Sequence, residues 1–159
     1  MPVTLGTLTA ARSSPLLREL SDNELAKLAD LMDVVTFAKG DRIFEQDGGG
    51  DEMYVLLSGQ VGVARKGAKD RDKERLLAVV GEGECIGEMA LADNGPRSAT
   101  VSALEEVRAL RLDNAQFQTL RDSDPKMAIK MTLGIFRLLS KRIRQIDKNL
   151  EIVHYWMFA

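Results

Sequence analysis

The segment from Gly83 to Thr100 decides how the chain is interpreted. It reads Gly-Glu-Cys-Ile-Gly-Glu-Met-Ala-Leu-Ala-Asp-Asn-Gly-Pro-Arg-Ser-Ala-Thr. Residues 87–91 suit one short helical turn, and the free N–H groups at such an N-terminus favour an anion. Arg97 can hold two phosphate oxygens with parallel hydrogen bonds, whereas ionised Glu88 only accepts hydrogen bonds and so suits a sugar hydroxyl. The segment therefore matches a ribose phosphate.

Short β-rich runs separated by turns flank this segment. The spacing predicts strands at 34–37, 42–44, 53–57, 61–65, 75–80, 100–104 and 107–112. Several short strands at this spacing indicate a small barrel or jelly roll. We interpret the charged run 65–75 as a solvated hairpin tip. We interpret Gly48-Gly49-Gly50 as a turn, because no Gly-Lys-Ser/Thr follows it.

Helical signals lie on both sides of the strands. Ser14-Pro15 predicts a short helix over 16–20, and the capping box from Ser21 to Glu24 predicts a second one that ends near residue 32. After the strands, Asp113 is expected to cap a short helix. Asp124-Pro125 is expected to start a long helix that reaches about residue 153.

The predicted fold class is therefore mainly β with flanking helices. It is a β-roll or jelly-roll barrel with short N-terminal helices, a short helix at 87–91 and a long C-terminal helix. We expect one domain at 14–153, preceded by a flexible leader at 1–13. The C-terminal helix, 125–157, would act as a lid or dimer helix.

Composition excludes several classes of protein. The net charge of -2 argues against a nucleic-acid binder, and no apolar run is long enough to predict a membrane span. The single cysteine, Cys85, fits a reducing, cytoplasmic compartment and is interpreted as a small buried hydrophobe. With one cysteine and one histidine, His154, the chain offers no metal site, iron–sulfur cluster or nucleophile–base pair. We therefore expect no enzyme, no metal and no cofactor.

Two short motifs in the deciding segment, residues 87–91 and 96–100, resemble the phosphate-binding cassette of the cyclic-nucleotide-binding domain family. Residues 37–44 and 53–59 are similar to the early strands of that family. The resemblance implies that Glu88 binds the ribose 2′-hydroxyl and that Arg97 pairs with the cyclic phosphate. The ligand-binding residues it implies are Ile86, Gly87, Glu88, Met89, Ala90, Arg97, Ser98 and Ala99.

Base selectivity stays open at this point. A hydroxyl at Ser98 could touch the base, and the family pattern at this position leaves cAMP and cGMP both open, with a lean to cAMP. The pair Cys85-Ile86 departs from the bulky or aromatic residues common in the family, which concerns only the packing behind the cassette.

The end of the chain predicts a dimer. A heptad seam of apolar residues steps by four and three along the last helix, where it would serve as a dimer or lid seam. It consists of Leu139, Ile143, Ile146, Leu150 and Val153, and Met157 continues the spacing. The charged residues beside it, Arg142 among them, are expected to face water or the rim of a partner. The first half, 127–138, is expected to pack on the chain's own barrel. The sequence continues for about 35 residues after Asp124, and the long helix uses nearly all of them. We therefore expect no helix-turn-helix in this sequence and no direct binding to DNA.

Three functions remain from the sequence. The first is a sensor whose cyclic nucleotide moves the C-terminal helix over the pocket as a lid. The second is an interaction or dimerisation module of the same fold that binds no ligand. The third is a regulator inside a larger complex with an unidentified effector protein. The expected partners are thus the nucleotide, a second copy of the chain and that effector.

Overall fold

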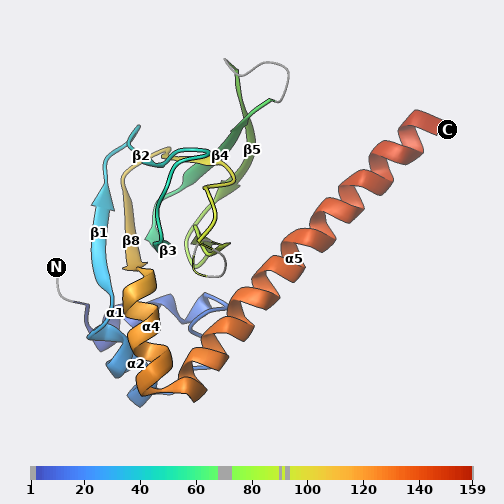
Figure 1. Cartoon of the computed structure of the whole chain (residues 1–159). Helices are drawn as coiled ribbons and strands as arrows, with labels where there is room; N and C mark the ends of the chain where they lie inside the picture. Colours follow the sequence, from blue (N-terminus) through green and yellow to red (C-terminus); the bar gives the residue numbers. More distant parts are fainter. Residues whose placement is uncertain (1–2, 68–72, 90, 92–93, 159) are drawn as a thin grey trace.

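The computed structural model describes the whole chain except residues 1–2, 68–72, 90, 92–93 and 159, and the side chains of 147–158. Figure 1 shows a group of strands with helices at one end and one long helix that projects from it. The helices are α1 (Leu5–Ala10), η1 (Ala11–Ser13), α2 (Asp22–Ala29), α4 (Asn114–Ser123) and α5 (Pro125–Phe158). The strands are β1 (Asp33–Phe37), β2 (Arg42–Phe44), β3 (Met53–Ser58), β4 (Val61–Lys66), β5 (Glu74–Val80), β6 (Cys85–Ile86), β7 (Thr100–Ala103) and β8 (Val107–Leu112).

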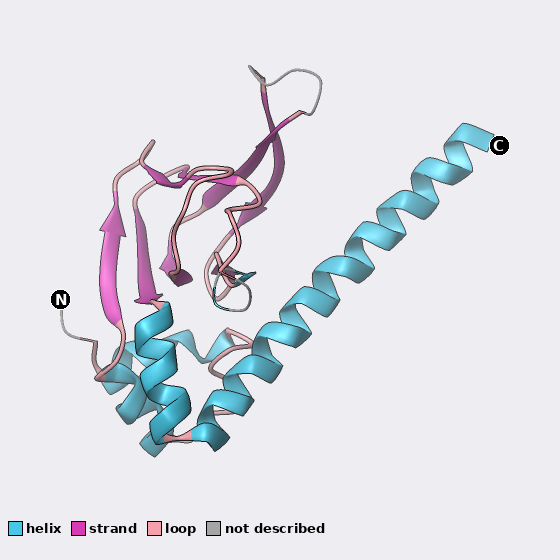
Figure 2. Ribbon diagram, viewed as in Figure 1, coloured by secondary structure: helices cyan, strands magenta, loops and turns pink. Residues whose placement is uncertain are grey.

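The strands form two antiparallel sheets (Figure 2) with orders β1-β8-β3-β6 and β2-β7-β4-β5. This confirms the predicted jelly-roll class, and all seven predicted strands are present within two residues at each end. The two-residue strand β6 was not predicted. It pairs with β3, where Tyr54 lies opposite Ile86, so it brings the deciding segment to the edge of the first sheet.

Strand β3 is buried on both faces, and this explains its continuous apolar run. Side chains alternate between the two faces of a strand. Met53 and Val55 belong to the core shared with the helices, while Tyr54 and Leu56 belong to the core between the sheets. The same strand therefore fixes the barrel to the helical layer.

The N-terminal segment differs from the sequence expectation. Residues 5–13, expected in a flexible leader, form α1 and η1, because Thr4 caps α1 and Leu8 is fully buried in the helical core. The helix predicted over 16–20 is instead a pair of turns, in which Arg18 N–H bonds to Ser14 and Leu20 N–H to Leu17. Its apolar residues still face the core.

The capping signals of the other helices are confirmed. Ser21 and Glu24 form the capping box of α2, although α2 ends at Ala29 rather than near residue 32. Asp113 caps α4 through a bond from Gln116 N–H. Asp124 accepts from the N–H of Met127 at the start of α5 (3.2 Å). Each cap supplies an acceptor for an N–H that the helix cannot pair.

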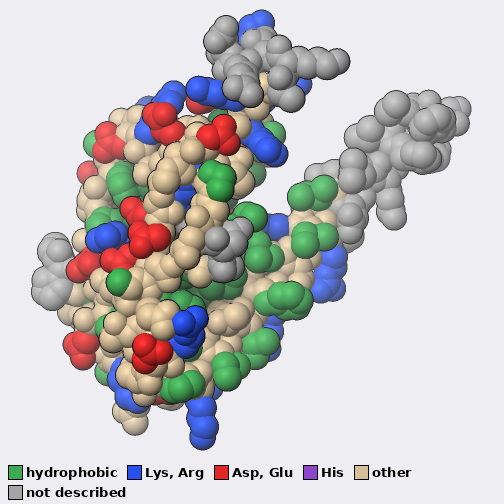
Figure 3. All heavy atoms as spheres, viewed as in Figure 1, with side chains coloured by type: hydrophobic (Ala, Val, Ile, Leu, Met, Phe, Trp, Pro, Cys, Tyr) green, Lys and Arg blue, Asp and Glu red, His purple; other side chains and the backbone are tan. Residues whose placement is uncertain are grey.

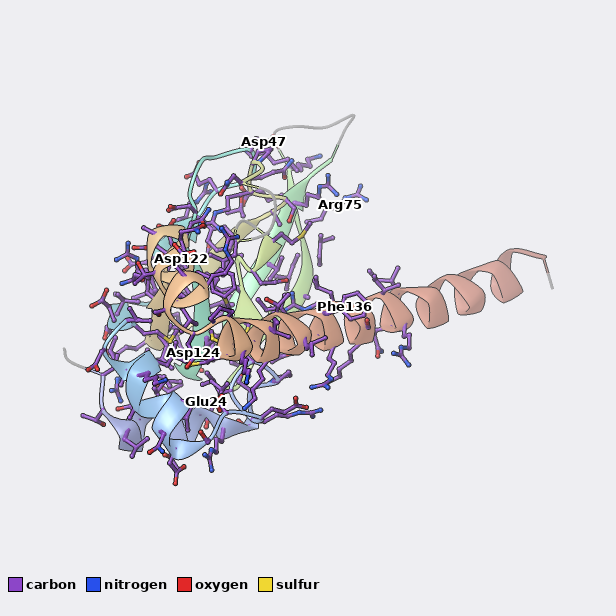
Figure 4. All side chains as sticks on the ribbon, turned by 60° about the horizontal axis from the view of Figure 1, so that its bottom comes forward. Glu24, Asp47, Arg75, Asp122, Asp124 and Phe136 are labelled. Carbon is purple, nitrogen blue, oxygen red and sulfur yellow. The ribbon has the colours of Figure 1, made fainter. Side chains whose placement is uncertain are left out.

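The first half of α5 is anchored to the N-terminal helices. Met127, Met131 and Leu138 are buried in the helical core, and a Cβ on Gly134 would lie 2.4 Å from the carbonyl oxygen of Pro15. Ion pairs also join this half to the N-terminal region: Lys27–Asp124, Glu24–Lys130 and Glu19–Arg137. Figure 4 labels Glu24 and Asp124 where α2 meets the start of α5.

Candidate functional site

The backbone of Arg97 is fixed by the loop after β2. Its N–H donates to the carbonyl of Gly48 (3.0 Å), and its carbonyl accepts from the N–H of Asp47 (2.8 Å). The hydroxyl of Thr100, at the start of β7, accepts from the N–H of Gln46 (3.0 Å). The pairing of β2 with β7 therefore continues into this loop and sets the position from which Arg97 enters the interior.

The guanidinium of Arg97 is buried, with 4% of the residue exposed. It lies over the ring of Phe44, 4.3 Å from Cζ to the ring centroid, a cation–π geometry. Nη2 donates to Glu52 Oε2 (3.2 Å), and Nη1 donates to the carbonyl of Gly87 (3.4 Å). Nε is buried and has no hydrogen-bond partner among the described residues. A buried donor without a partner is costly, so this one points to an acceptor supplied from outside.

Two glycines make room for that guanidinium. A Cβ on Gly87 would lie 2.7 Å from Nη1 of Arg97, and a Cβ on Gly50 would lie 2.7 Å from Nη2. Both have positive φ values, 75° and 141°, which favour glycine. The turn predicted at 48–50 therefore also encloses the side chain of Arg97.

Glu88 is equally buried, with 4% exposed, and its partner comes from α5. Arg142 Nη1 donates to Glu88 Oε1 (2.5 Å), and Nη2 donates to the carbonyl of Cys85 (2.5 Å). The sequence expectation that Arg142 faces water or a partner's rim is wrong. A buried carboxylate requires a nearby cation, and the fold brings Arg142 to it across 54 positions of sequence.

Both charged groups face one cavity of about 490 Å³, within the usual range for small-molecule sites. Sheet residues and α5 form its other walls (Figure 3 shows apolar side chains on this part of α5). The residues that line it are Phe44, Val63, Ala78, Val80, Ile86, Gly87, Glu88, Met89, Gly95, Pro96, Arg97, Ser98, Ala99, Val101, Leu139, Arg142, Ile143 and Ile146.

Seven of the eight ligand-binding residues expected from the sequence line this cavity, and Ala90 lies outside the described residues. The first three residues of the expected dimer seam, Leu139, Ile143 and Ile146, line it as well. The side chains of Leu150 and Val153 lie outside the described part of the chain.

The sequence analysis did not place Phe44, Gly50, Glu52 or Arg142 at the binding site. These residues lie far from the cassette in sequence and meet it only in the fold. A local signal existed for Phe44 alone, since it ends a segment that resembles the early strands of the family.

Burial raises the pKa of two other side chains near the site. It raises the pKa of Cys85 to about 12, so the thiol stays protonated and behaves as the small hydrophobe expected from the sequence. Burial, followed by the charge of Glu52, raises the pKa of Tyr54 to about 12. Among the described residues no group of three or more His, Cys, Asp or Glu side chains could hold a metal ion, and no described helix is long and apolar enough to cross a membrane.

A family model described as the cyclic nucleotide-binding domain matches residues 34–124, which is more than half of the chain. The chain therefore belongs to the cyclic nucleotide-binding domain family. The matched residues include the whole cassette and both charged groups at the cavity.

Curated relatives and solved structures agree with this family. A CRP-like cAMP-activated global transcriptional regulator of Mycobacterium tuberculosis is 29% identical over 126 residues, 79% of this chain and 54% of the relative. A cyclic AMP receptor protein of Thermus thermophilus is 31% identical over 144 residues, 91% of this chain and 64% of the relative. The chain thus spans about half to two thirds of these relatives' length. A solved cyclic nucleotide-binding domain from Methylobacillus flagellatus matches with a TM-score of 0.82 and 25% identity, covering 92% of this chain and 83% of that one.

Proposed function

We propose that the protein is a sensor that binds a cyclic nucleotide, cAMP in preference to cGMP, in the cavity beside Arg97 and Glu88. The observation that carries this proposal is the guanidinium of Arg97, which is buried at the cavity wall and whose Nε has no hydrogen-bond partner among the described residues. A cyclic phosphate would supply the missing acceptor, and a guanidinium suits phosphate oxygens. The family membership and the names of the curated relatives support the same ligand class.

Glu88 would bind the ribose. Its ion pair with Arg142 uses Oε1, and a carboxylate has further acceptor sites on its second oxygen, so Oε2 can accept from the 2′-hydroxyl. The backbone N–H groups near Met89, Ala90, Ser98 and Ala99 would complete the phosphate cradle.

The base would lie between the second sheet and α5. Val63, Ala78 and Val80 form the sheet wall, and Leu139, Ile143 and Ile146 form the helix wall. Such a largely apolar slot binds the base by burial and shape. Ser98 lines the same cavity and leaves the choice of base open, and the lean to cAMP rests on the family resemblance at this position.

Coupling between the ligand and α5 would run through Arg142. This side chain joins the helix to Glu88 and to the carbonyl of Cys85, so a ribose that binds Glu88 changes the environment of the helix. A ligand shifts a conformational equilibrium only by its differential affinity for the two states. We expect residues 139–146 to take different positions in structures solved with and without nucleotide. Identical positions in both would contradict the coupling.

A non-catalytic role and a homodimer complete the proposal. Ile143 and Ile146 are 58% and 57% exposed on α5, which supports a second copy of the chain as the partner of this helix. The family membership supports three further parts of the proposal. The protein binds its ligand without catalysing a reaction, it acts in the cytoplasm, and it passes the signal to an effector protein. A module of this fold that dimerises and binds no nucleotide is the alternative.

Calorimetric titration of the purified protein with cAMP and then cGMP tests the site. We expect Arg97→Leu to weaken binding about thirtyfold to several thousandfold, since losing one member of a desolvated charge pair costs roughly 2–5 kcal/mol. Arg75→Leu, which removes an exposed arginine on β5, is the control and should bind as the parent does. Equal binding by Arg97→Leu and the parent would refute the site assignment.

A further inference from the structure

Arg97 has a carboxylate partner that is not itself part of the cavity wall. Nη2 of Arg97 lies 3.2 Å from Glu52 Oε2, and Glu52 is half-buried directly before β3. Arg97 lines the cavity and Glu52 is not among the lining residues. Glu52 can therefore act on a bound phosphate only through Arg97 or through space.

Glu52 is itself held in place. Its Oε2 also accepts from the N–H of Asp51 (2.9 Å), and its Oε1 accepts from the hydroxyl of Tyr54 (3.4 Å). The hydroxyl of Tyr54 is protonated at neutral pH, and the raised pKa of about 12 extends this to more alkaline pH. The carbonyl oxygen of Glu52 lies 2.8 Å from where a Cβ on Gly87 would be. The carboxylate is thus fixed next to the cassette.

We propose that Glu52 is the built-in counter-ion of Arg97 and that it lowers the affinity of this site for the nucleotide phosphate. This inference rests on the proposed function. A buried guanidinium is stabilised by an opposite charge, and Glu52 provides that charge when no nucleotide is bound. A phosphate brings a second anion to the same guanidinium, and the two anions repel each other. Glu52 is therefore a positioning residue that sets the affinity of the phosphate subsite.

The two consequences of removing the charge have opposite signs. Without the carboxylate, the protein without nucleotide loses the counter-ion of Arg97 and becomes less stable. The phosphate is then the only anion at the guanidinium of Arg97, so the affinity for the nucleotide rises. A residue with only a structural role would lower stability and affinity together.

The test compares Glu52→Gln with the parent by calorimetric titration with cAMP and by thermal unfolding without nucleotide. Glutamine keeps the size and one acceptor oxygen of the side chain but removes its charge. We expect cAMP binding about two- to fivefold tighter, as for a partly exposed charge pair, and a lower Tm. Glu45→Gln removes an exposed carboxylate that pairs with Arg42 and should change neither quantity. If Glu52→Gln does not fold, Glu52→Asp draws the carboxylate back from Nη2, and the same directions are expected.

The outcomes separate this inference from the proposed function. If neither the parent nor the variant binds cAMP or cGMP, the proposed function fails and the inference fails with it. If the parent binds and the variant binds equally or more weakly, the counter-ion role is refuted while nucleotide binding stands. Tighter binding without a lower Tm would also refute it.

Discussion

At the residue scale, two glycines lie directly against the guanidinium of Arg97. Gly87 approaches Nη1 from the cassette, and Gly50 approaches Nη2 from the loop before β3. Both residues also adopt positive φ values that other residues rarely take. Their small size therefore decides where the charge can lie.

Gly87→Ala should weaken both the fold and the site. The new methyl would lie 2.7 Å from Nη1 of Arg97 and 2.8 Å from the carbonyl oxygen of Glu52, and the positive φ costs roughly 1–2 kcal/mol for an L-residue. We expect a lower Tm and cAMP binding about tenfold weaker or more, because the hydrogen bonds of a charged group are displaced.

Gly81→Ala is the matched control for this substitution. A Cβ at Gly81 meets nothing within 4 Å, and its φ is not positive. Thermal unfolding and titration should therefore leave this variant close to the parent. If Gly87→Ala has the Tm and the cAMP affinity of the parent, the small size of Gly87 is not needed to position the guanidinium of Arg97.

The two residues that we propose bind the nucleotide could be identified from the sequence, but their ion-pair partners could not. Glu88 and Arg97 occur in one short segment, where their chemistry and their spacing are visible together. Their ion-pair partners, Arg142 and Glu52, lie 54 and 45 positions away. Nothing in the local sequence of those partners distinguishes them from surface charges, because only the folded chain brings them to a buried opposite charge.

At the scale of elements, the strands were predictable because turns and β-rich runs alternate along the chain. Strand β6 (Cys85–Ile86) was missed because two residues are too few to show a period. Helix α1 (Leu5–Ala10) was missed because a six-residue segment with a glycine carries little helical signal, and it is stabilised by burying Leu8. Short elements depend on tertiary packing more than on their own sequence.

The junction between α2 and α5 predicts a pH dependence of stability. The hydrogen bond from Lys130, followed by that from Ser21 N–H, lowers the pKa of Glu24 below its ordinary 4.5. Ionised Glu24 therefore stabilises the fold fully above pH 4.5, and this contribution is lost as the pH falls through the lowered pKa of the folded state. Lys27 lowers the pKa of Asp124 in the same way.

Glu24→Gln should reduce the loss of stability in acid. Denaturant unfolding measured between about pH 3 and about pH 7 would show a flatter curve for this variant than for the parent. Asp30→Asn, at the other end of α2, changes a carboxylate without an ion-pair partner among the described residues and should follow the parent. If the free energy of unfolding of Glu24→Gln falls in acid as steeply as that of the parent, the ion pair between Glu24 and Lys130 does not contribute to the pH dependence.

At the scale of the whole molecule, α5 contacts both the N-terminal helices and the cavity. Its first half is anchored to the N-terminal helices, and residues 139–146 close one side of the cavity. In Figure 1 the helix then continues away from the strands. The sequence predicted this division between 127–138 and the later residues. It also predicted a lid or dimer role for the seam, whose first three residues line the cavity.

The proposed dimer is tested by the oligomeric state in solution. We expect the parent to sediment at twice the chain mass of 17.6 kDa. Ile146→Glu should shift it toward the monomer, because a charge would replace an exposed apolar side chain in the seam. Gln145→Glu adds the same charge at a neighbouring exposed position of α5 and should leave the dimer intact. A parent that is monomeric at all concentrations would contradict the dimer.

The most direct test of the nucleotide site is a crystal structure of the protein with cAMP. It should show the cyclic phosphate bonded to the guanidinium of Arg97, including its Nε, and the ribose 2′-hydroxyl bonded to the carboxylate of Glu88. Nucleotide bound elsewhere on the protein, or an unoccupied cavity in crystals grown with saturating cAMP, would contradict the account.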